Sequence, residues 1–274
     1  MDIIALIKWG AGYPTDEFNM TYRALRNYAA DDVDICCITD NPQGLDPDLK
    51  TIALPAIPMD PARWADGMWP KLAMFKHDIF PAGARVIFMD VDVAVVAPVA
   101  ELFDVISDDT IHIIKDWPTY HEKWFPKLFR VVRGGNSSVV GFVAGRHTEL
   151  WDRFNTDTQT SLATYRNDQD YITGEARDLR YFPEHWIGSF KKSVAPLPPI
   201  AWFSACRPHP DCKIVAFHGK PDISDLSARH KSYIARLLEG FGHVQWVEDY
   251  LDKYAPQKKL ECSETSIYDH ISKK

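Results

Sequence analysis

The feature that most constrains this chain is a regular alternation of two kinds of segment. Continuous apolar runs of strand length alternate with segments whose apolar residues recur every three or four positions. In chain order the expected elements are strand Ile3–Ile7, helix Asp16–Ala30, strands Val33–Thr39 and Thr51–Leu54, helix Trp69–Phe80 and strand Arg85–Met89. Thr15 or Asp16 is expected to cap the first helix. This β-α-β-β-α-β order predicts an α/β fold with a single mixed, mostly parallel sheet flanked by helices.

The second half of the chain is less regular. The expected strands and helices there are strands Ile111–Ile114, Ser138–Val143 and Lys213–Phe217, helices Arg146–Phe154 and Asp168–Glu175, and two C-terminal helices within Ile223–Tyr254. Ala195–Pro210 is rich in proline and is expected to be a long loop. The interpretation is a single domain over residues 1–254, in three parts of about 1–105, 106–222 and 223–254, followed by a polar tail at 255–274.

Composition excludes several classes of function. The formal net charge is −7 at pH 7, whereas a general nucleic-acid binder needs a basic face that neutralises phosphates. No charge-free apolar stretch is long enough to cross a bilayer. The motifs G-x-x-x-x-G-K-S/T, G-x-G-x-x-G and G-x-S-x-G are absent, which argues against nucleoside-triphosphate, dinucleotide and serine-hydrolase sites.

The cysteines indicate the compartment. There are five, an odd number, and Cys36 and Cys37 are adjacent. A disulfide framework uses an even set of separated cysteines, so a reduced, cytoplasmic location is expected, with peripheral contact to a membrane as an open option.

Two aspartates follow the most apolar strand. Val86–Met89 leads directly into Asp90 and Asp92, and residues two apart in an extended chain point to the same side. Ligands of open α/β sheets bind at the carboxyl ends of the strands, where this pair is expected. Adjacent carboxylates repel unless a cation joins them, and oxygen ligands suit Mg²⁺ or Mn²⁺. The pair predicts a divalent-metal site, with capping aspartates as the structural alternative.

A second motif follows a late apolar strand. His218, Gly219 and Lys220 come directly after Phe217. The glycine lets a ligand approach the backbone closely, and the lysine ammonium suits a phosphate. An imidazole added to two carboxylates favours Mn²⁺ over a site of oxygen ligands alone. The alternative is a structural histidine in a turn.

Two further groups carry polar side chains. Asp168 and Gln169 open a predicted helix, where Asp168 is either a functional carboxylate or a helix cap. Gly134–Ser138 is expected to be a flexible turn, in which Asn136 and Ser137 can donate hydrogen bonds to hydroxyl groups.

The order of these motifs resembles that of nucleotide-sugar glycosyltransferases with the GT-A (Rossmann-like) fold, and within them glycosyltransferase family 8 and its bacterial relatives. The match runs from Ile3 to Pro221, and its most specific part is a D-x-D motif followed late in the chain by F-H-G-x-P. The resemblance implies transfer of a hexose from a nucleotide sugar, with UDP-sugar expected, to a glycan or lipid-linked acceptor. It also implies Mn²⁺ or Mg²⁺ as cofactor and a retaining mechanism.

The resemblance also implies a role for each motif. The implied metal ligands are Asp90, Asp92 and His218. The implied nucleotide contacts are Ile7, Lys8, Trp9, Tyr13, Asp40, Lys71 and Val91. Gly219 and Lys220 would hold the diphosphate, and Asn136, Ser137 and Asp168 the donor sugar. Asp168 and Gln169 are the implied catalytic residues.

Two other functions stay open at this point. A haloacid-dehalogenase-type phosphohydrolase also begins with an apolar strand and D-x-D, and would use Asp90 as nucleophile and Asp92 as general acid. Its motif lies on an early strand and ends in Thr or Val, whereas this motif lies later and has Ala94 there. The other is a non-catalytic protein that binds a nucleotide sugar or glycan. If the chain is a transferase, Trp117–Arg133 and Ala195–Pro210 are expected to face the acceptor.

Overall fold

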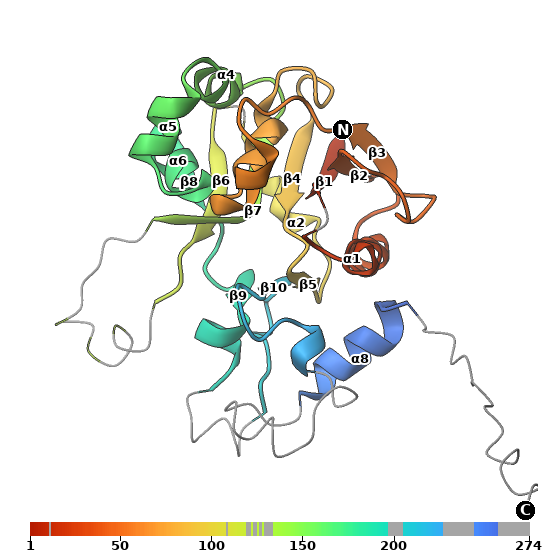
Figure 1. Cartoon of the computed structure of the whole chain (residues 1–274). Coiled ribbons are helices and arrows are strands. Elements are labelled where there is room, and N and C mark those ends of the chain that lie inside the picture. Colours follow the sequence, from red (N-terminus) through yellow and green to blue (C-terminus); the bar gives the residue numbers. More distant parts are fainter. Residues whose placement is uncertain are drawn as a thin grey trace, which may run out of the picture.

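The computed structural model describes residues 1–10, 12–107, 109–118, 122, 125, 128, 134–196, 205–226 and 244–256. Its larger sheet has seven strands in the order β3-β2-β1-β4-β7-β6-β8 (Figure 1). These strands are β1 (Asp2–Lys8), β2 (Asp34–Thr39), β3 (Lys50–Ala53), β4 (Arg85–Met89), β6 (Ile111–Lys115), β7 (Gly135–Val143) and β8 (Leu179–Tyr181). β1, β2, β3 and β4 run parallel, β6 and β8 are parallel to each other, and β7 is antiparallel to both of its neighbours. The predicted mixed, mostly parallel sheet is therefore confirmed.

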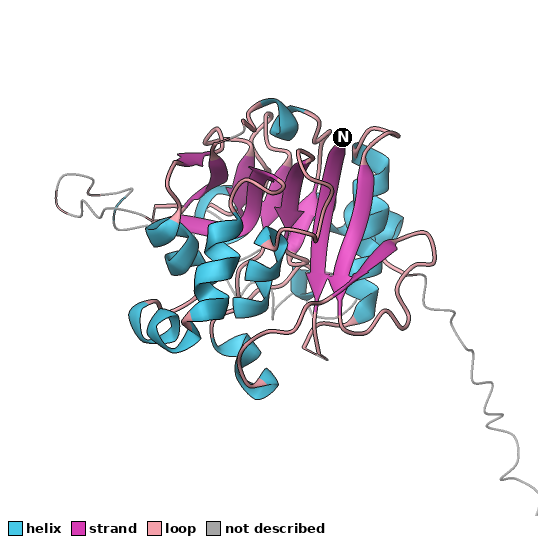
Figure 2. Ribbon diagram, turned by 90° about the horizontal axis from the view of Figure 1, so that it is seen from above, coloured by secondary structure: helices cyan, strands magenta, loops and turns pink. Residues whose placement is uncertain are grey.

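Helices cover both faces of this sheet (Figure 2). The α-helices are α1 (Thr15–Tyr28), α2 (Glu101–Asp104), α4 (Thr148–Thr156), α5 (Thr158–Thr164), α6 (Asp168–Glu175) and α8 (Gln245–Tyr254). The shorter turns are the 3₁₀ helices η1 (Pro61–Asp66), η2 (Trp69–Phe75) and η5 (Ser224–Leu226) and the π-helix η3 (Phe190–Val194).

The strand sequences explain the two covered faces. Successive side chains of a strand point to opposite faces of the sheet. In β1, Ile4 and Leu6 join the hydrophobic core beneath α1, whereas Ile3, Ala5 and Ile7 join a second core with η2, α4 and α6. A strand buried on both faces is a continuous apolar run, and this is the pattern that the sequence shows.

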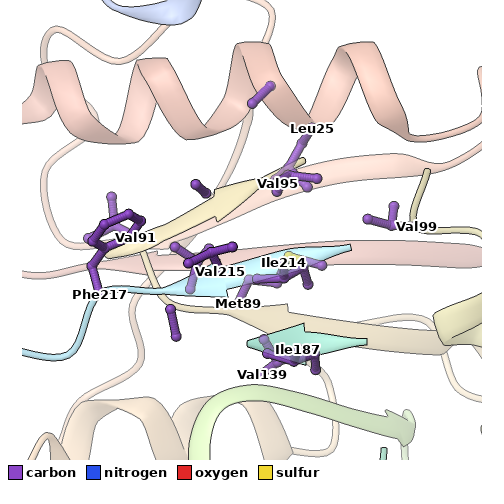
Figure 3. Packing of buried hydrophobic residues seen from close by; sticks show 14 of the residues in the cluster. Leu25, Met89, Val91, Val95, Val99, Val139, Ile187, Ile214, Val215 and Phe217 are labelled. Atoms are coloured by element: carbon purple, nitrogen blue, oxygen red, sulfur yellow. The ribbon is translucent and has the colours of Figure 1, made fainter. Parts of the chain in front are cut away.

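A smaller second sheet was not expected from the sequence. It consists of β5 (Val93–Val95), β10 (Ile214–Ala216) and β9 (Ile187–Ser189), in the order β5-β10-β9. Figure 1 shows it with α8 below the larger sheet. Its side chains share one core with α1 and the ends of β4 and β7 (Figure 3).

The second sheet brings together two motifs that are far apart in sequence. β10 pairs antiparallel with β5, and Ala216 lies opposite Val93. The next pair continues the register, since the backbone N–H of Phe217 donates to the carbonyl of Asp92 at 2.8 Å. The D-x-D motif lies just before β5, and the F-H-G-x-P motif lies just after β10. Because the two strands are antiparallel, the two motifs lie side by side at the same end of this strand pair.

Three expectations about local structure were wrong. The predicted helix 69–80 is a 3₁₀ helix that ends at Phe75; all seven of its residues are buried, so packing on every side decides its form rather than one apolar face. The first helix is preceded by Pro14 without a side-chain cap, not capped by Thr15 or Asp16. The expected flexible turn Gly134–Ser138 lies largely within β7, because its backbone pairs with β6.

Other expectations fall partly outside the described residues. Of the two helices expected in 223–254, the structure describes η5 and α8. Residues 197–204 of the predicted loop, most of 119–133 and all of 257–274 lie outside the described ranges. Among the residues that are described, no helix is long and apolar enough to cross a membrane.

Candidate active site

The site is built around a buried lysine among carboxylates. Lys71, on η2, is 5% exposed. Its Nζ donates to Asp90 Oδ2 at 2.7 Å and lies 4.0 Å from Asp168 Oδ2. Burial disfavours the ammonium, but Asp90 and Asp168 outweigh it and raise the pKa of Lys71 above its ordinary value. Lys71 is therefore not an ordinary solvated lysine.

Asp92, like Asp168 at Oδ2, carries a buried carboxylate oxygen without a hydrogen-bond partner. In Asp92 this oxygen is Oδ1. Burial and the neighbouring charge of Asp90 raise the pKa of Asp92 to about 7, while Lys71 acts in the opposite direction. A buried polar atom without a partner is rare in native proteins and points to a missing ligand.

A small pocket joins the D-x-D motif to the end of β1. It has a volume of about 40 Å³ and is lined by Ile7, Trp9, Tyr13, Met68, Lys71, Asp90, Val91 and Asp92. The structure thus brings five of the seven predicted nucleotide-binding residues together with both predicted aspartate ligands. Burial, followed by Asp92 and Asp90, raises the pKa of Tyr13 to about 12, so its hydroxyl stays protonated at neutral pH.

The other two predicted nucleotide-binding residues connect the strand ends beside this pocket. Lys8 Nζ donates to the carbonyl of Asn41 at 3.2 Å. The backbone N–H of Gly10 donates to Asp40 Oδ2 at 3.1 Å, and Gly10 has a φ of +56°, a conformation that glycine adopts readily. Both side chains therefore link the end of β1 to the end of β2, and neither of them lines the pocket.

Asp168 reaches the site from α6. The helix cap is Asn167, whose side chain accepts from the N–H of Asp170 at 2.8 Å, so the capping interpretation of Asp168 is wrong. Asp168 is instead buried beside Lys71, and burial raises its pKa to about 6 against the opposing effects of Lys71 and a hydrogen bond from Ser137.

An irregularity in β7 places Ser137. The β6–β7 register shifts between Ile113 and Ile114, which pair with Val140 and Asn136. Such bulges redirect side chains and are frequent beside active sites. Ser137 is buried and bonds Asp168, whereas Asn136 Oδ1 accepts from the N–H of Ser138 at 3.0 Å. Gln169 follows Asp168 in the first turn of α6 and is half-buried.

His218 lies in a neighbouring cluster. Its Nε2 is 2.6 Å from Ser189 Oγ, and its ring stacks on Trp117 with centroids 5.2 Å apart. Burial, then Lys192 and Lys191, lower the pKa of His218, which favours the neutral imidazole. Within the described ranges, no three His, Cys, Asp or Glu side chains are grouped closely enough to hold a metal ion.

The turn after His218 has the expected glycine geometry. Gly219 has a φ of +65°, where a side chain is strained. Lys220 follows with a side chain that is 75% exposed and paired with two carboxylates, Asp222 and, at 3.0 Å, Asp225.

Sequence reasoning missed a large cavity next to His218. Its volume is about 530 Å³, and its lining combines aromatic rings with two carboxylates: Ile114, Lys115, Asp116, Trp117, Pro118, Tyr181, Phe182, Pro183, Glu184 and Ile187. Trp117 and Pro118 belong to the segment expected to face an acceptor, whereas the other residues come from β6, β8 and β9 and from the stretches that follow β6 and β8. It also missed Met68 in the small pocket, which carries a positive φ of 57°.

Comparisons by sequence and by structure give different results. No family model and no curated protein matches the sequence. Solved structures do match, among them the galactosyltransferase LgtC in complex with donor and acceptor sugar analogues, with a TM-score of 0.57, 11% identity, and coverage of 92% of this chain and 95% of that one. The bifunctional glycosyltransferase WbbM gives a TM-score of 0.52 and 12% identity over 92% of this chain and 51% of that one.

A third similar structure is the glycosyltransferase GlyE of Streptococcus pneumoniae TIGR4. It gives a TM-score of 0.56 and 10% identity, over 93% of this chain and 61% of that one. With the seven-stranded mixed sheet and its flanking helices, these similarities show that the chain has a GT-A-type glycosyltransferase fold.

Proposed function

We propose that this chain is a metal-dependent glycosyltransferase that moves a hexose from a nucleotide sugar to a glycan or lipid-linked acceptor. The observation that carries the proposal is the group of Lys71, Asp90, Asp92 and Asp168 at the carboxyl end of β4, in a fold shared with glycosyltransferases. Lys71 and Asp168 are buried in this group, and the two aspartates of the D-x-D motif are half-buried. Ligands of α/β sheets bind at that edge, and charged groups with perturbed pKa values gather at functional sites.

The small pocket is proposed to receive the nucleotide. Trp9 and Tyr13 offer aromatic surfaces on which a base can stack, and they stand next to the D-x-D motif. A UDP-sugar is the proposed donor, by the resemblance to family 8. The galactosyltransferase LgtC, which has a similar fold, was crystallised with donor and acceptor sugar analogues, and this is in keeping with a sugar donor.

The carboxylates fit a divalent cation. Asp92 Oδ1 is buried without a hydrogen-bond partner. Asp90 stands two residues before it, across a bend at Val91 and Asp92 rather than in the extended segment that the sequence predicted, and its charge raises the pKa of Asp92. We propose these two residues as oxygen ligands of Mn²⁺ or Mg²⁺, with His218 as third ligand; in this structure the imidazole contacts Ser189 instead. When bound, such an ion would neutralise charge on a diphosphate.

The remaining residues are proposed to stabilise the transition state. Cleaving the bond between sugar and phosphate leaves negative charge on the departing diphosphate, and cations that meet this charge act more strongly in the transition state than in the ground state. Asp168 and Gln169 are proposed to lie nearest the reacting carbon, with Ser137 and Asn136 beside the sugar hydroxyls. In a retaining transfer the leaving phosphate oxygen can take the proton of the acceptor hydroxyl.

The large cavity is the proposed acceptor site. Trp117, Tyr181 and Phe182 supply apolar faces for a sugar ring, and Asp116 and Glu184 supply acceptors for its hydroxyl groups. The ring of Trp117 stacks on His218, so this cavity lies next to the turn that carries the proposed diphosphate-binding residues Gly219 and Lys220. A phosphohydrolase or a non-catalytic binding protein is not favoured, because the similar structures reported above are glycosyltransferases.

Calorimetric titration with UDP, with and without Mn²⁺, tests this function. We expect binding that depends on Mn²⁺ and is lost in Asp92→Ala and in His218→Ala. Asp31→Ala is the matched control, because Asp31 is exposed in the loop after α1. Removing one preorganised charged group should also lower the transfer rate by about 10²–10³-fold. A folded wild-type protein that binds neither UDP nor a UDP-sugar at any Mn²⁺ concentration would falsify the proposal.

A further inference from the structure

A further cavity lies away from the proposed active site, where α8 packs against α1. Its volume is about 220 Å³. The residues that line it are Tyr28, Val96, Pro208, Trp246, Asp249, Tyr250, Lys253 and Tyr254. Tyr28 ends α1, Val96 directly follows β5, and most of the others lie on α8. Because the D-x-D motif directly precedes β5, this cavity, called the α8 pocket below, lies at the other end of that strand.

The walls of the α8 pocket are mainly aromatic. The rings of Tyr250 and Tyr254 meet edge to face, with centroids 4.8 Å apart. Trp246 adds an indole whose Nε1 donates to the carbonyl of Cys206 at 2.9 Å, so its polar atom already has a partner within the protein. Such rings offer apolar surface to the C–H groups of a ligand.

Two polar atoms in these walls are left without a partner. Tyr250 and Tyr254 are each 5% exposed, and neither hydroxyl makes a hydrogen bond within the part of the chain that the structure describes. Burial raises the pKa of Tyr250 against an opposing effect of the Val95 backbone, and Tyr254 and Tyr28 add to the rise, so the three phenols lie near one another. Native proteins rarely bury hydroxyl groups in this way unless a ligand or water bonds them.

The charges of the lining balance each other. Asp249 and Lys253 are both exposed, and each can form further hydrogen bonds with a ligand. Lys253 Nζ lies 6.0 Å from the ring centre of Tyr28 and 5.0 Å from that of Tyr254. Aromatic rings bind cations in this way, so the chain's own ammonium already takes the place of a cationic ligand. The carboxylate of Asp249 disfavours an anion, and a neutral ligand is left.

We propose that the α8 pocket binds a single neutral sugar ring. A sugar ring combines C–H faces, which stack on aromatic side chains, with hydroxyl groups that bond phenols, a carboxylate and an ammonium. The pocket is smaller than the sites of drug-sized ligands, which measure about 300–1,000 Å³, and it suits one ring. An extended peptide would instead need a groove with pockets for alternate side chains. This site uses neither nucleotide nor metal, so it stands independently of the proposed function.

Saturation-transfer NMR without UDP and without Mn²⁺ tests this site. The probes are the methyl glycosides of glucose, galactose, mannose and N-acetylglucosamine, and the wild type should bind at least one of them. Tyr250→Phe and Tyr254→Phe should each weaken that binding by about 3- to 10-fold, because each removes one hydroxyl that bonds the sugar. Neither variant should lower the midpoint of urea unfolding, since neither hydroxyl bonds the described protein.

Tyr171→Phe is the matched control. Tyr171 is also buried, but its hydroxyl donates to the carbonyl of Leu150 at 2.9 Å, so this variant should lose stability and keep the affinity for the sugar. Trp117→Ala reports on the large cavity and should also keep that affinity.

Three results would overturn the proposal. The first is a folded wild-type protein that binds none of the four sugars. The second is binding that is unchanged in both Tyr250→Phe and Tyr254→Phe. The third is binding that is lost only in Trp117→Ala, which would place the sugar in the large cavity. Because nucleotide and metal are left out, each of these results leaves the proposed function intact, and a failure to bind UDP leaves the α8 pocket intact.

Discussion

At the scale of single residues, the site holds more negative than positive charge, which is unfavourable in a poorly solvated environment. Asp90, Asp92 and Asp168 bring three carboxylates near one ammonium, that of Lys71. Burying carboxylates costs free energy unless each is paired, and Asp92 has an oxygen without a partner. Such a cost is tolerated where a ligand relieves it, which is the physical basis for placing a cation at this position.

The cost at Asp92 predicts a dependence of stability on pH. Its pKa is raised from 3.8 to about 7, and that of Asp168 from 3.8 to about 6, so between about pH 4 and pH 7 the folded protein binds protons that the unfolded chain does not. The contribution of these groups to stability is present below pH 4 and lost as pH rises through 7. Asp92→Asn should therefore raise the free energy of unfolding at pH 8 by about 1–2 kcal/mol in the presence of a chelator.

Urea unfolding at pH 4.5 and pH 8 measures this effect. Near pH 4.5, where Asp92 is protonated in the folded state, the difference between Asp92→Asn and wild type should shrink. Asp31→Asn, at an exposed position, should change little at either pH. A variant Asp92→Asn that is less stable than wild type at pH 8 without metal would contradict this account.

At the scale of elements, the approach of η2 to α6 assembles the site. Lys71 comes from η2 and Asp168 from the start of α6, and the segment just before η2 bonds the start of α6 because the N–H of Asp168 donates to the carbonyl of Gly67 at 2.9 Å. The ring of Trp69 also meets Tyr171 of α6 edge-on, with centroids 6.1 Å apart. The ion pair between Lys71 and Asp168 depends on this close approach.

Gly67 is the residue that permits the approach. A Cβ there would lie 2.5 Å from Trp69 Nε1 and 3.0 Å from the carbonyl oxygen of Arg166. Gly67→Ala should therefore destabilise the fold by about 1–3 kcal/mol and separate Lys71 from Asp168. Thermal unfolding of this variant beside Gly12→Ala checks the prediction, since a Cβ on Gly12 meets nothing within 4 Å. Equal thermal stability of the two variants would contradict the prediction, because it would show that η2 and α6 can shift apart without loss of stability.

At the scale of the whole molecule, two sheets meet at the site. The larger sheet positions the D-x-D motif at the end of β4, and the smaller sheet brings the F-H-G-x-P motif against it through β5 and β10. Val91 and Phe217 lie close together in the shared core (Figure 3). Packing of the smaller sheet thus places the turn formed by His218, Gly219 and Lys220 beside the D-x-D motif.

Phe217 connects the core of the smaller sheet to the turn that begins at His218. It is buried and stacks on Phe190 with centroids 5.2 Å apart, directly before His218. Phe217→Ala should cost about 3–5 kcal/mol of stability. It should also weaken pyrophosphate binding by the folded protein, because the turn that begins at His218 loses the packing that positions it. Phe80→Ala is the matched control, because Phe80 is equally apolar and buried but belongs to the other core.

Urea unfolding and calorimetry at low temperature, where both variants are folded, separate the two effects. Phe80→Ala should lose stability and keep the affinity of wild type for pyrophosphate with Mn²⁺. If Phe217→Ala keeps that affinity as well, the position of the turn does not depend on the core of the smaller sheet.

The sequence by itself determined most strands of the larger sheet, although not β8, and placed two aspartates at the carboxyl end of β4. Strands buried on both faces are continuous apolar runs, and this local pattern survives in any tertiary context, so β1, β2 and β4 and the aspartates that follow β4 were predictable. The role of Lys71, by contrast, was implied by a resemblance, because nothing in its spacing shows that η2 would bury it against Asp90.

Only the tertiary structure decided which distant residues meet. Three features follow from hydrogen bonds or packing between segments far apart in the chain: the pairing of β5 with β10, the strand structure around Ser137 and the large cavity beside Trp117. Spacing along a sequence reports which face of an element a residue occupies. It carries no information on which other element will cover that face, because that choice is made by the packing of the whole core.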